Sequence, residues 1–157
     1  MLLWYMDEHT IILLVEDRED DILLMKRSFR SARISNPLFV VRDGEEARQY
    51  LSAEGRYSNR AEFPLPDIIL LDLNMPGMDG FELLSWIRNH PDLHSLRVVI
   101  LTSSDQDDDI EQACQLRANS FLTKPDSFQD LVETARLFHD YWLHKDSAPE
   151  VSRSGKG

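Results

Sequence analysis

The fold of this chain is decided by residues 68–80, Ile68-Ile69-Leu70-Leu71-Asp72-Leu73-Asn74-Met75-Pro76-Gly77-Met78-Asp79-Gly80. A short apolar run delivers Asp72 to its C-terminal end, and a turn of Asn, Pro and Gly precedes a new amphipathic segment. An apolar run without polar alternation is typical of a strand that is buried on both faces of a parallel sheet. Ligands of such sheets bind beyond the carboxyl ends of the strands. We therefore expect Asp72 to belong to a functional site and not to the core.

Outward from this strand, short apolar runs alternate with amphipathic stretches along the whole chain. The apolar runs predict strands over Ile11–Val15, Leu38–Val41, Asp67–Leu71, Arg97–Leu101 and Ser120–Thr123. The amphipathic stretches predict helices over Asp20–Arg33, Gly44–Ala53, Gly80–Asn89, Asp107–Leu116 and from Ser127 to about Leu143. Five successive strand–helix units predict an α/β fold, a three-layer sandwich with a parallel sheet.

The length of 157 residues predicts one domain, which we place over residues 10–143. Residues 1–9 are then an N-terminal extension, and the polar residues 144–157 predict a disordered tail. The connection over residues 54–66 contains Gly and Pro and is unusually long, so it predicts a surface loop. Two explanations of this loop stay open, a tolerated insertion and a segment that reads a partner.

The composition is that of an ordinary globular chain with an acidic balance. Apolar residues make up 42% of the chain and charged residues 29%, and the formal net charge is −11. This charge argues against nucleic acid and anionic membranes as partners, because both attract a basic face. Cys114 is the only cysteine, so no internal disulfide is expected, and no apolar stretch is long enough to span a membrane. We therefore expect a cytoplasmic protein.

Reactive side chains follow the predicted strands around Asp72. Glu16 and Asp17 come directly after the first predicted strand. Thr102 follows the fourth predicted strand, and Lys124 follows the fifth. Because the carboxyl ends of parallel strands lie at one edge of a sheet, we expect three carboxylates, a hydroxyl and an ammonium to face one another.

Three carboxylates in one crevice are unfavourable without a cation beside them. Two like charges about 4 Å apart repel by roughly 4 kcal/mol at an effective dielectric constant of 20. Oxygen ligands with no histidine or cysteine nearby suit Mg²⁺ or Mn²⁺ and not Zn²⁺. Mg²⁺ typically takes few carboxylates together with a phosphate oxygen. The pattern therefore indicates a site for a phosphoryl group, with Lys124 as a fixed positive charge and Thr102 as a hydrogen-bond donor.

Each of these residues has a plainer explanation when it is taken alone. Acidic residues such as Glu16 and Asp17 also favour the first turn of a helix. Thr102 also suits the cap region of the next helix, and Lys124 an ordinary solvated lysine. Asp79 is expected to be a turn or cap residue and not a ligand. It is the ordered occurrence of the set at strand ends that favours a common site.

The motifs together resemble the receiver domain of two-component response regulators. They are the pair Glu16-Asp17, the block 71–80, Leu101-Thr102-Ser103 and Lys124-Pro125. The resemblance implies a flavodoxin-like three-layer α/β/α sandwich with a five-stranded parallel sheet of order 2-1-3-4-5. The long 54–66 loop and the aromatic end of the last predicted helix also resemble the single-domain regulators that partner phytochrome-type histidine kinases.

The resemblance implies a metal and phosphorylation role for the acidic residues. Asp72 matches the phosphorylated aspartate, which also contacts the ion. Asp17 matches the direct Mg²⁺ ligand, and Glu16 its neighbour, which often acts through water. The backbone carbonyl of Asn74 matches a further metal contact. Mg²⁺, or Mn²⁺ in its place, is therefore the expected cofactor.

The resemblance also implies a switch next to the phosphorylated residue. Lys124 matches the residue that pairs with the phosphoryl oxygens, and its bond to Pro125 is commonly cis in the family. Thr102 matches the switch hydroxyl and Phe121 the switch aromatic. Phe121 lacks the hydroxyl of the frequent tyrosine, and plain core packing stays an alternative for it.

The implied function is that of a phosphoacceptor signalling domain and not of an enzyme with its own substrate. A sensor histidine kinase, of the phytochrome type, would phosphorylate Asp72, and the domain would signal by conformational change and assist its own dephosphorylation. The aromatic end of the last helix predicts a homodimer through the face of the fourth helix, fifth strand and fifth helix. The inward stripe of that last helix is expected to hold Phe128, Leu131, Ala135, Phe138 and Trp142.

Two rival functions agree less well with the sequence. A phosphoaspartyl hydrolase of the haloacid dehalogenase type carries a second aspartate two residues after the first, and that position is Asn74 here. An adaptor with a receiver fold that works without phosphorylation usually lacks one or more of the site residues. All of them are present in this chain, and beryllofluoride binding with Mg²⁺ distinguishes the two functions.

Overall fold

The structure is a computed structural model that describes residues 9–73, 75, 79–103 and 106–143. The predicted tail over 144–157, nearly all of the predicted 1–9 extension and the predicted metal contact of Asn74 lie outside the described residues. No helix in the described part of the chain is both long and apolar enough to cross a bilayer.

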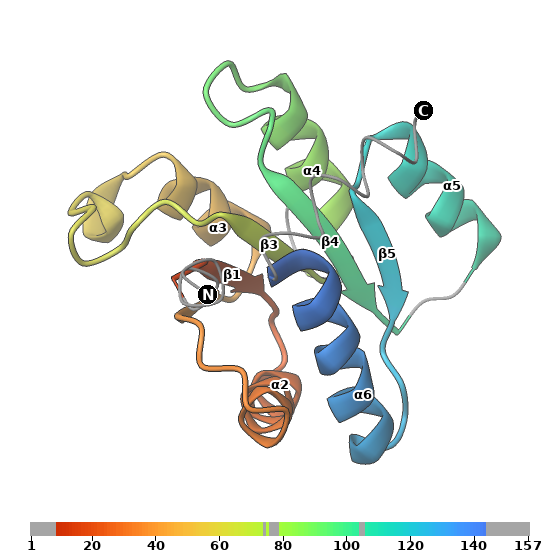
Figure 1. Ribbon diagram of the computed structural model, residues 1–157. Coiled ribbons are helices and arrows are strands. Elements are labelled where there is room, and N and C mark those ends of the chain that lie inside the picture. The colour runs from red at the N-terminus through yellow and green to blue at the C-terminus, as the bar shows by residue number, and fades with distance from the viewer. Residues whose placement is uncertain (1–8, 74, 76–78, 104–105, 144–157) are drawn as a thin grey trace.

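Five parallel strands form one sheet in the order β2-β1-β3-β4-β5 (Figure 1). The strands are β1 Ile12–Val15, β2 Leu38–Val41, β3 Ile68–Leu71, β4 Arg97–Thr102 and β5 Ser120–Thr123. β1 and β3 lie in the interior of the sheet, and every residue of both strands is buried, as their unbroken apolar sequences predict. The flavodoxin-like sheet order that the family resemblance implies is confirmed.

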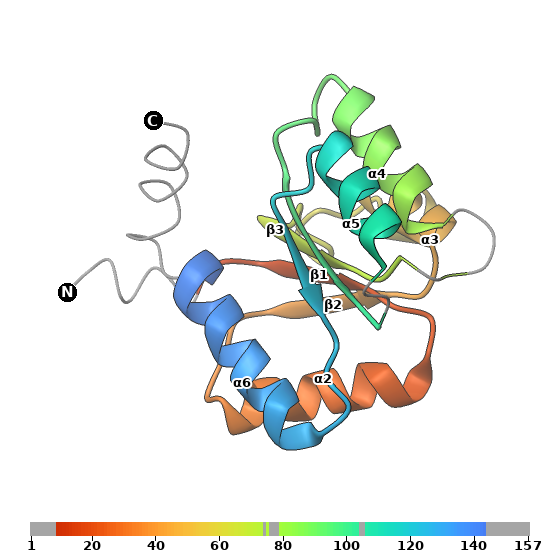
Figure 2. The same ribbon diagram turned by 90° about the vertical axis from the view of Figure 1, so that its right-hand side faces the viewer.

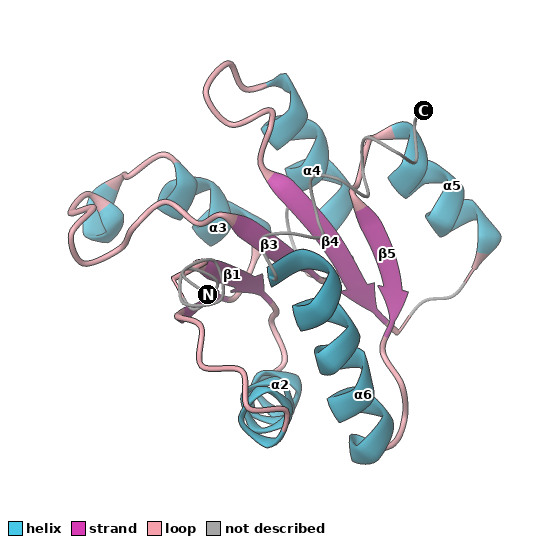
Figure 3. Cartoon of the chain, in the orientation of Figure 1, coloured by secondary structure: helices cyan, strands magenta, loops and turns pink. Residues whose placement is uncertain are grey.

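Helices follow the strands in alternation, as Figure 3 shows. They are α2 Glu19–Ser31, α3 Gly44–Leu51, α4 Gly80–Asn89, α5 Asp107–Gln115 and α6 Phe128–Phe138, which continues into the π-helical turn η2 His139–Leu143. Three helices end one or two residues earlier than predicted. In each case a residue just beyond the end has a left-handed backbone, Arg33 (φ 63°), Ala53 (φ 57°) or Arg117 (φ 65°), a common way to end a helix.

The helices cover both faces of the sheet and create two cores (Figure 2). α2 and α6 pack on one face, where the rings of Phe29 and Phe138 stack with centroids 6.1 Å apart. α3, α4 and α5 pack on the other face, where Leu83, Leu84 and Ile87 of α4 are fully buried. Helices packed on both faces therefore hold the carboxyl edge of the sheet in a fixed position.

The buried stripe of α6 differs from the predicted one at two positions. Leu131, Ala135, Phe138 and Trp142 are buried as predicted, but Phe128 is 40% exposed. Phe128 is the first residue of α6, directly after its cap Ser127, so helical spacing alone does not bring it onto the sheet. Val132, which the prediction omitted, is buried.

The 54–66 connection is an ordered layer on the end of α3 rather than a loose surface loop. It begins with the short helix η1 Gly55–Tyr57, and the rings of Tyr57 and Phe63 pack against each other and against Tyr50 of α3. The Arg60 guanidinium donates hydrogen bonds to the carbonyls of Tyr50, Leu51 and Phe63. Two of these bonds reach carbonyl groups of the last turn of α3, for which the helix itself supplies no N–H donor.

Candidate functional site

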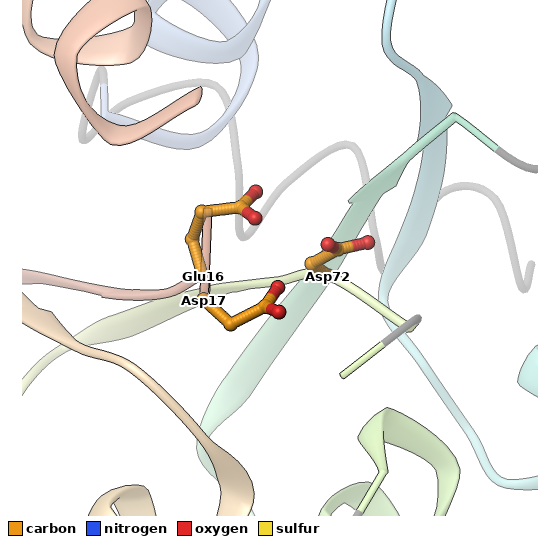
Figure 4. A group of neighbouring side chains, drawn as sticks. All are labelled: Glu16, Asp17 and Asp72. Carbon is orange, nitrogen blue, oxygen red and sulfur yellow. The ribbon is translucent and has the colours of Figure 1, made fainter. Parts of the chain in front are cut away.

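Three carboxylates meet at the carboxyl edge of the sheet, as the sequence predicts. The pairing of Val15 with Leu71 aligns the ends of β1 and β3, so Glu16 and Asp17 lie beside Asp72 (Figure 4). One carboxylate oxygen from each of the three lies within 4.8 Å of the others. Glu16 is 2% exposed and Asp72 is 5% exposed. Negative charge is therefore concentrated in a nearly dry position.

One oxygen of the Asp17 carboxylate is an acceptor that a cation would satisfy. Its Oδ1 atom is buried and has no hydrogen-bond partner among the described residues. A buried acceptor without a partner is costly, most of all when it carries charge. Three carboxylates without histidine or cysteine form the donor set of a hard divalent cation such as Mg²⁺ or Mn²⁺. The residues therefore fit the expected ion.

Lys124, directly after β5, brings the positive charge of the site. Its Nζ atom lies 2.5 Å from Glu16 Oε1, 3.1 Å from Asp21 Oδ2 and 3.7 Å from Asp72 Oδ2. The implied cis bond between Lys124 and Pro125 is absent, because no peptide bond of the described residues is cis. A trans bond is the more stable form before proline unless a turn requires the other.

The pKa values of Glu16 and Lys124 are both raised, for different reasons. Burial raises the pKa of Glu16 to about 7, the charge of Asp72 adds to this, and the Lys124 contact opposes it. For Lys124, burial acts to lower the pKa, but the hydrogen bond to Glu16 and the charge of Asp72 outweigh it and raise the pKa. The negative charge of the carboxylates thus exceeds the positive charge that Lys124 supplies.

Thr102 and Phe121 lie on one side of the sheet next to this cluster. Thr102 is the fully buried last residue of β4, and its carbonyl accepts a 2.7 Å hydrogen bond from the Lys124 backbone N–H. Phe121 is paired with Ile100 and packs as a half-buried side chain into the core beneath α3, α4 and α5. Because side chains alternate along a strand, Thr102 faces the same side as Ile100. The two residues predicted to switch therefore share one face.

The backbone that carries Asp72 is clamped by the start of α4. Asp79 caps this helix, because its side chain accepts a hydrogen bond from the Glu82 N–H and the Glu82 side chain accepts one from the Asp79 N–H. Asp79 is thus a cap, as predicted. A Cβ atom at Gly80 would lie 2.7 Å from the Asp72 carbonyl oxygen and 2.8 Å from Leu73 Cα. Only glycine fits there without moving this segment.

Sequence reasoning missed one member of the cluster, Asp21 of α2. Its carboxylate contacts both Lys124 and Arg18, the residue before α2. Its position could have revealed it as a candidate. Asp21 comes four residues after Asp17, in the first turn of α2 and next to the buried Ile22, so it lies at the start of a helix beside the site.

The profile of the response regulator receiver domain matches residues 12–136. The chain belongs to this family. It is therefore a receiver of two-component signalling, a phosphoacceptor whose partner is a phosphodonor kinase. Receiver domains bind a divalent metal ion, which agrees with the acidic cluster.

Two sequence relatives align with this receiver over most of both chains. The response regulator Rcp1 of Synechocystis sp. is 37% identical over 139 residues, which are 88% of this chain and 92% of Rcp1. The probable methanogenesis regulatory protein FilR2 of Methanothrix harundinacea is 39% identical over 139 residues, 88% of this chain and 87% of FilR2.

Solved structures of similar receivers share the fold. The phosphorylated cyanobacterial phytochrome response regulator RcpA superposes with a TM-score of 0.80 at 37% identity, covering 88% of this chain and 97% of RcpA. The Mn²⁺-bound form of Rcp1 superposes with a TM-score of 0.76 at 37% identity, covering 85% of this chain and 94% of Rcp1.

Proposed function

We propose that Asp72 is the residue of this receiver that accepts a phosphoryl group from the phosphohistidine of a sensor kinase. One observation carries the proposal: the nearly buried Asp72 carboxylate lies beside both the Glu16–Asp17 pair and the Lys124 ammonium. An acceptor carboxylate, a divalent-ion site and a fixed cation are the parts that phosphoryl transfer needs, because its catalysis is mostly positioning and charge stabilisation.

In this reaction a carboxylate oxygen of Asp72 attacks phosphorus in line with the leaving imidazole. The new P–O bond forms while the P–N bond of the phosphohistidine breaks, and the imidazole keeps the electron pair and takes up a proton. The Lys124 ammonium stabilises negative charge on the transferred group. When bound at Glu16, Asp17 and Asp72, Mg²⁺ supplies further positive charge to the phosphoryl oxygens. The Asn74 carbonyl is the fourth contact in this proposal.

The output of the phosphorylated receiver is a change of packing around β4 and β5. Thr102 moves toward the new phosphoryl oxygen as a hydrogen-bond donor, and the space that it leaves lets Phe121 turn inward. Support comes from the shared face of the two side chains and from the half-buried state of Phe121. A local charge thereby biases a two-state element of the fold.

The partner in this proposal is a kinase of the phytochrome type, and two copies of the receiver associate through α5, β5 and α6. Similarity to two cyanobacterial regulators supports the kinase class. Exposed Leu137 and Tyr141, one turn apart near the end of the chain's last described helix, support the dimer. Phosphotransfer profiling against purified histidine kinases identifies the cognate donor by its fastest label.

The deciding experiment is labelling with acetyl phosphate and Mg²⁺, read by intact-protein mass spectrometry. Wild type should gain one phosphoryl group and lose it again over time, and Asp72→Asn should gain none. Asp108→Asn, which changes an exposed aspartate of α5, is the matched control and should be labelled like wild type. Full labelling of Asp72→Asn would refute the assignment. A wild type that neither takes label nor binds beryllofluoride would be a phosphorylation-independent adaptor.

A further inference from the structure

Lys124 is hydrogen-bonded to two carboxylates, and neither belongs to Asp72. Its Nζ atom lies 2.5 Å from Glu16 Oε1 and 3.1 Å from Asp21 Oδ2. The 3.7 Å separation from Asp72 Oδ2 is too long for a hydrogen bond. Before phosphorylation, the cation that should serve the phosphoryl group is therefore near Asp72 but hydrogen-bonded to Glu16 and Asp21.

Asp21 reaches Lys124 because of its position on α2. The first turn of this helix carries Glu19, Asp20 and Asp21. The Glu19 side chain is 70% exposed and pairs with Arg42, whereas the Asp21 side chain is only 29% exposed. Asp21 lies one helical turn before the buried Met25, so its carboxylate borders the packed face of α2. One acid of the turn is thus aimed at the site.

We propose that Asp21 is a positioning residue that holds the Lys124 ammonium away from Asp72 until a phosphoryl group draws it across. The inference rests on the proposed function, because it requires Asp72 to be the acceptor. Asp21 and the phosphoryl oxygens compete for the same cation, since the ammonium has only three hydrogens to donate and Glu16 engages it as well. Asp21 therefore sets how readily Lys124 changes partner.

The first test compares the affinities of the Mg²⁺-loaded receivers for beryllofluoride, an anion that imitates a phosphoryl group on a carboxylate. Asp21→Asn should bind it roughly fivefold more tightly than wild type, within the range of coupling between contacting charged groups. Asp20→Asn is the matched control, because it removes the same charge from an exposed position of the same turn. It should keep the wild-type affinity, and Asp21→Glu should lie close to wild type.

The second test asks whether the effect acts through Lys124. Asp21→Asn should speed labelling by acetyl phosphate in the wild-type background, and the gain should vanish in a Lys124→Ala background. An unchanged affinity in Asp21→Asn, an equal gain in Asp20→Asn, or a gain that persists without Lys124 would each overturn the proposal. If wild type itself fails to bind beryllofluoride and to take label, the proposed function fails. Normal wild-type behaviour without an Asp21 effect rejects the role of Asp21 alone.

Discussion

The unpartnered oxygen of Asp17 is the residue-scale feature with the most direct energetic meaning. A buried acceptor without a hydrogen bond costs about 1–3 kcal/mol, and more when it is charged. Asp17 Oδ1 is such an acceptor among the described residues, and a cation bound there would satisfy it. Metal binding and local stability are therefore coupled at this residue.

We expect Asp17→Asn to weaken Mg²⁺ binding at least about tenfold, because it removes a full charge from a three-carboxylate site. Calorimetric titration with Mg²⁺ measures this effect. In EDTA the same variant should unfold at no lower denaturant concentration than wild type, since the lost carboxylate was unpaired. Asp20→Asn, an exposed change in α2, serves as control. Undiminished Mg²⁺ affinity in Asp17→Asn would contradict the metal role.

A second residue-scale prediction concerns Gly80. Gly80→Ala should lower the free energy of unfolding by about 1–3 kcal/mol, because the two atoms closest to the new Cβ are backbone atoms of Asp72 and Leu73, which cannot turn aside as a side chain can. It should also slow labelling by acetyl phosphate, since the clash displaces the acceptor. Gly55→Ala introduces a Cβ with nothing within 4 Å. Its left-handed backbone (φ 57°) adds strain of its own, so this variant is the control for the labelling rate and not for stability. Equal labelling rates in the two variants would argue against the clamp.

Sequence reasoning brought Glu16, Asp17, Asp72 and Lys124 together because parallel strands place their carboxyl ends at one edge. The role of Asp21 was not predictable from the sequence, for a physical reason. A helix assignment says which turn an acidic residue occupies, but the packing angle of the helix decides which distant group it reaches. The same limit applies to the close approach of Gly80, which depends on how a turn folds back.

At the scale of elements, the layer formed by residues 54–66 shows that composition does not determine how a connection packs. Gly55 and Pro64 predict a connection between regular elements, but its ordered packing arises only when Tyr57 and the half-buried Phe63 meet Tyr50 of α3. The exposed position of Phe128 is the converse case. Its spacing matches the buried stripe of α6, yet the first residue of that helix lies beyond the packed face.

The packed rings of Tyr50 and Tyr57 predict a loss of stability at alkaline pH. Burial raises the pKa of Tyr50 to about 12, with Arg60 acting against it, and burial with the Glu46 hydrogen bond raises the pKa of Tyr57 to about 12. Unfolded tyrosine ionises near pH 10, so the stabilisation is complete below that pH and is lost as pH rises toward 12. Urea unfolding should show this decline, and it should be shallower in Tyr50→Phe. Identical slopes would contradict the expectation.

At the scale of the whole molecule, the site and the proposed contact face lie on parts of one continuous frame. The sheet order and parallel direction place Asp72 at the carboxyl edge, while α6 packs beside α2 on one face. Alternating strands and helices sufficed to predict the α/β class. The order of the strands followed from the family resemblance, because periodicity does not say which strands are neighbours.

The proposed dimer gives a prediction at this scale. Leu137→Glu should keep the receiver monomeric with Mg²⁺ and beryllofluoride, because it places charge on a leucine side chain that is 64% exposed at the proposed interface. Sedimentation velocity measures the outcome. Leu23→Glu alters an exposed leucine on α2 and should dimerise like wild type. A wild type that stays monomeric under both conditions would remove the dimer.

The Arg60 guanidinium has a practical meaning for anyone who reshapes this receiver. Trimming residues 54–66, or transplanting the domain into a chimeric sensor without them, would remove the Arg60 hydrogen bonds to the carbonyls of Tyr50 and Leu51. It would also release Glu46, which accepts hydrogen bonds from the Tyr57 hydroxyl and from the Arg42 N–H. Arg42 directly follows β2. Deleting this distant connection would therefore loosen the carboxyl edge of the sheet, where we propose that phosphotransfer takes place.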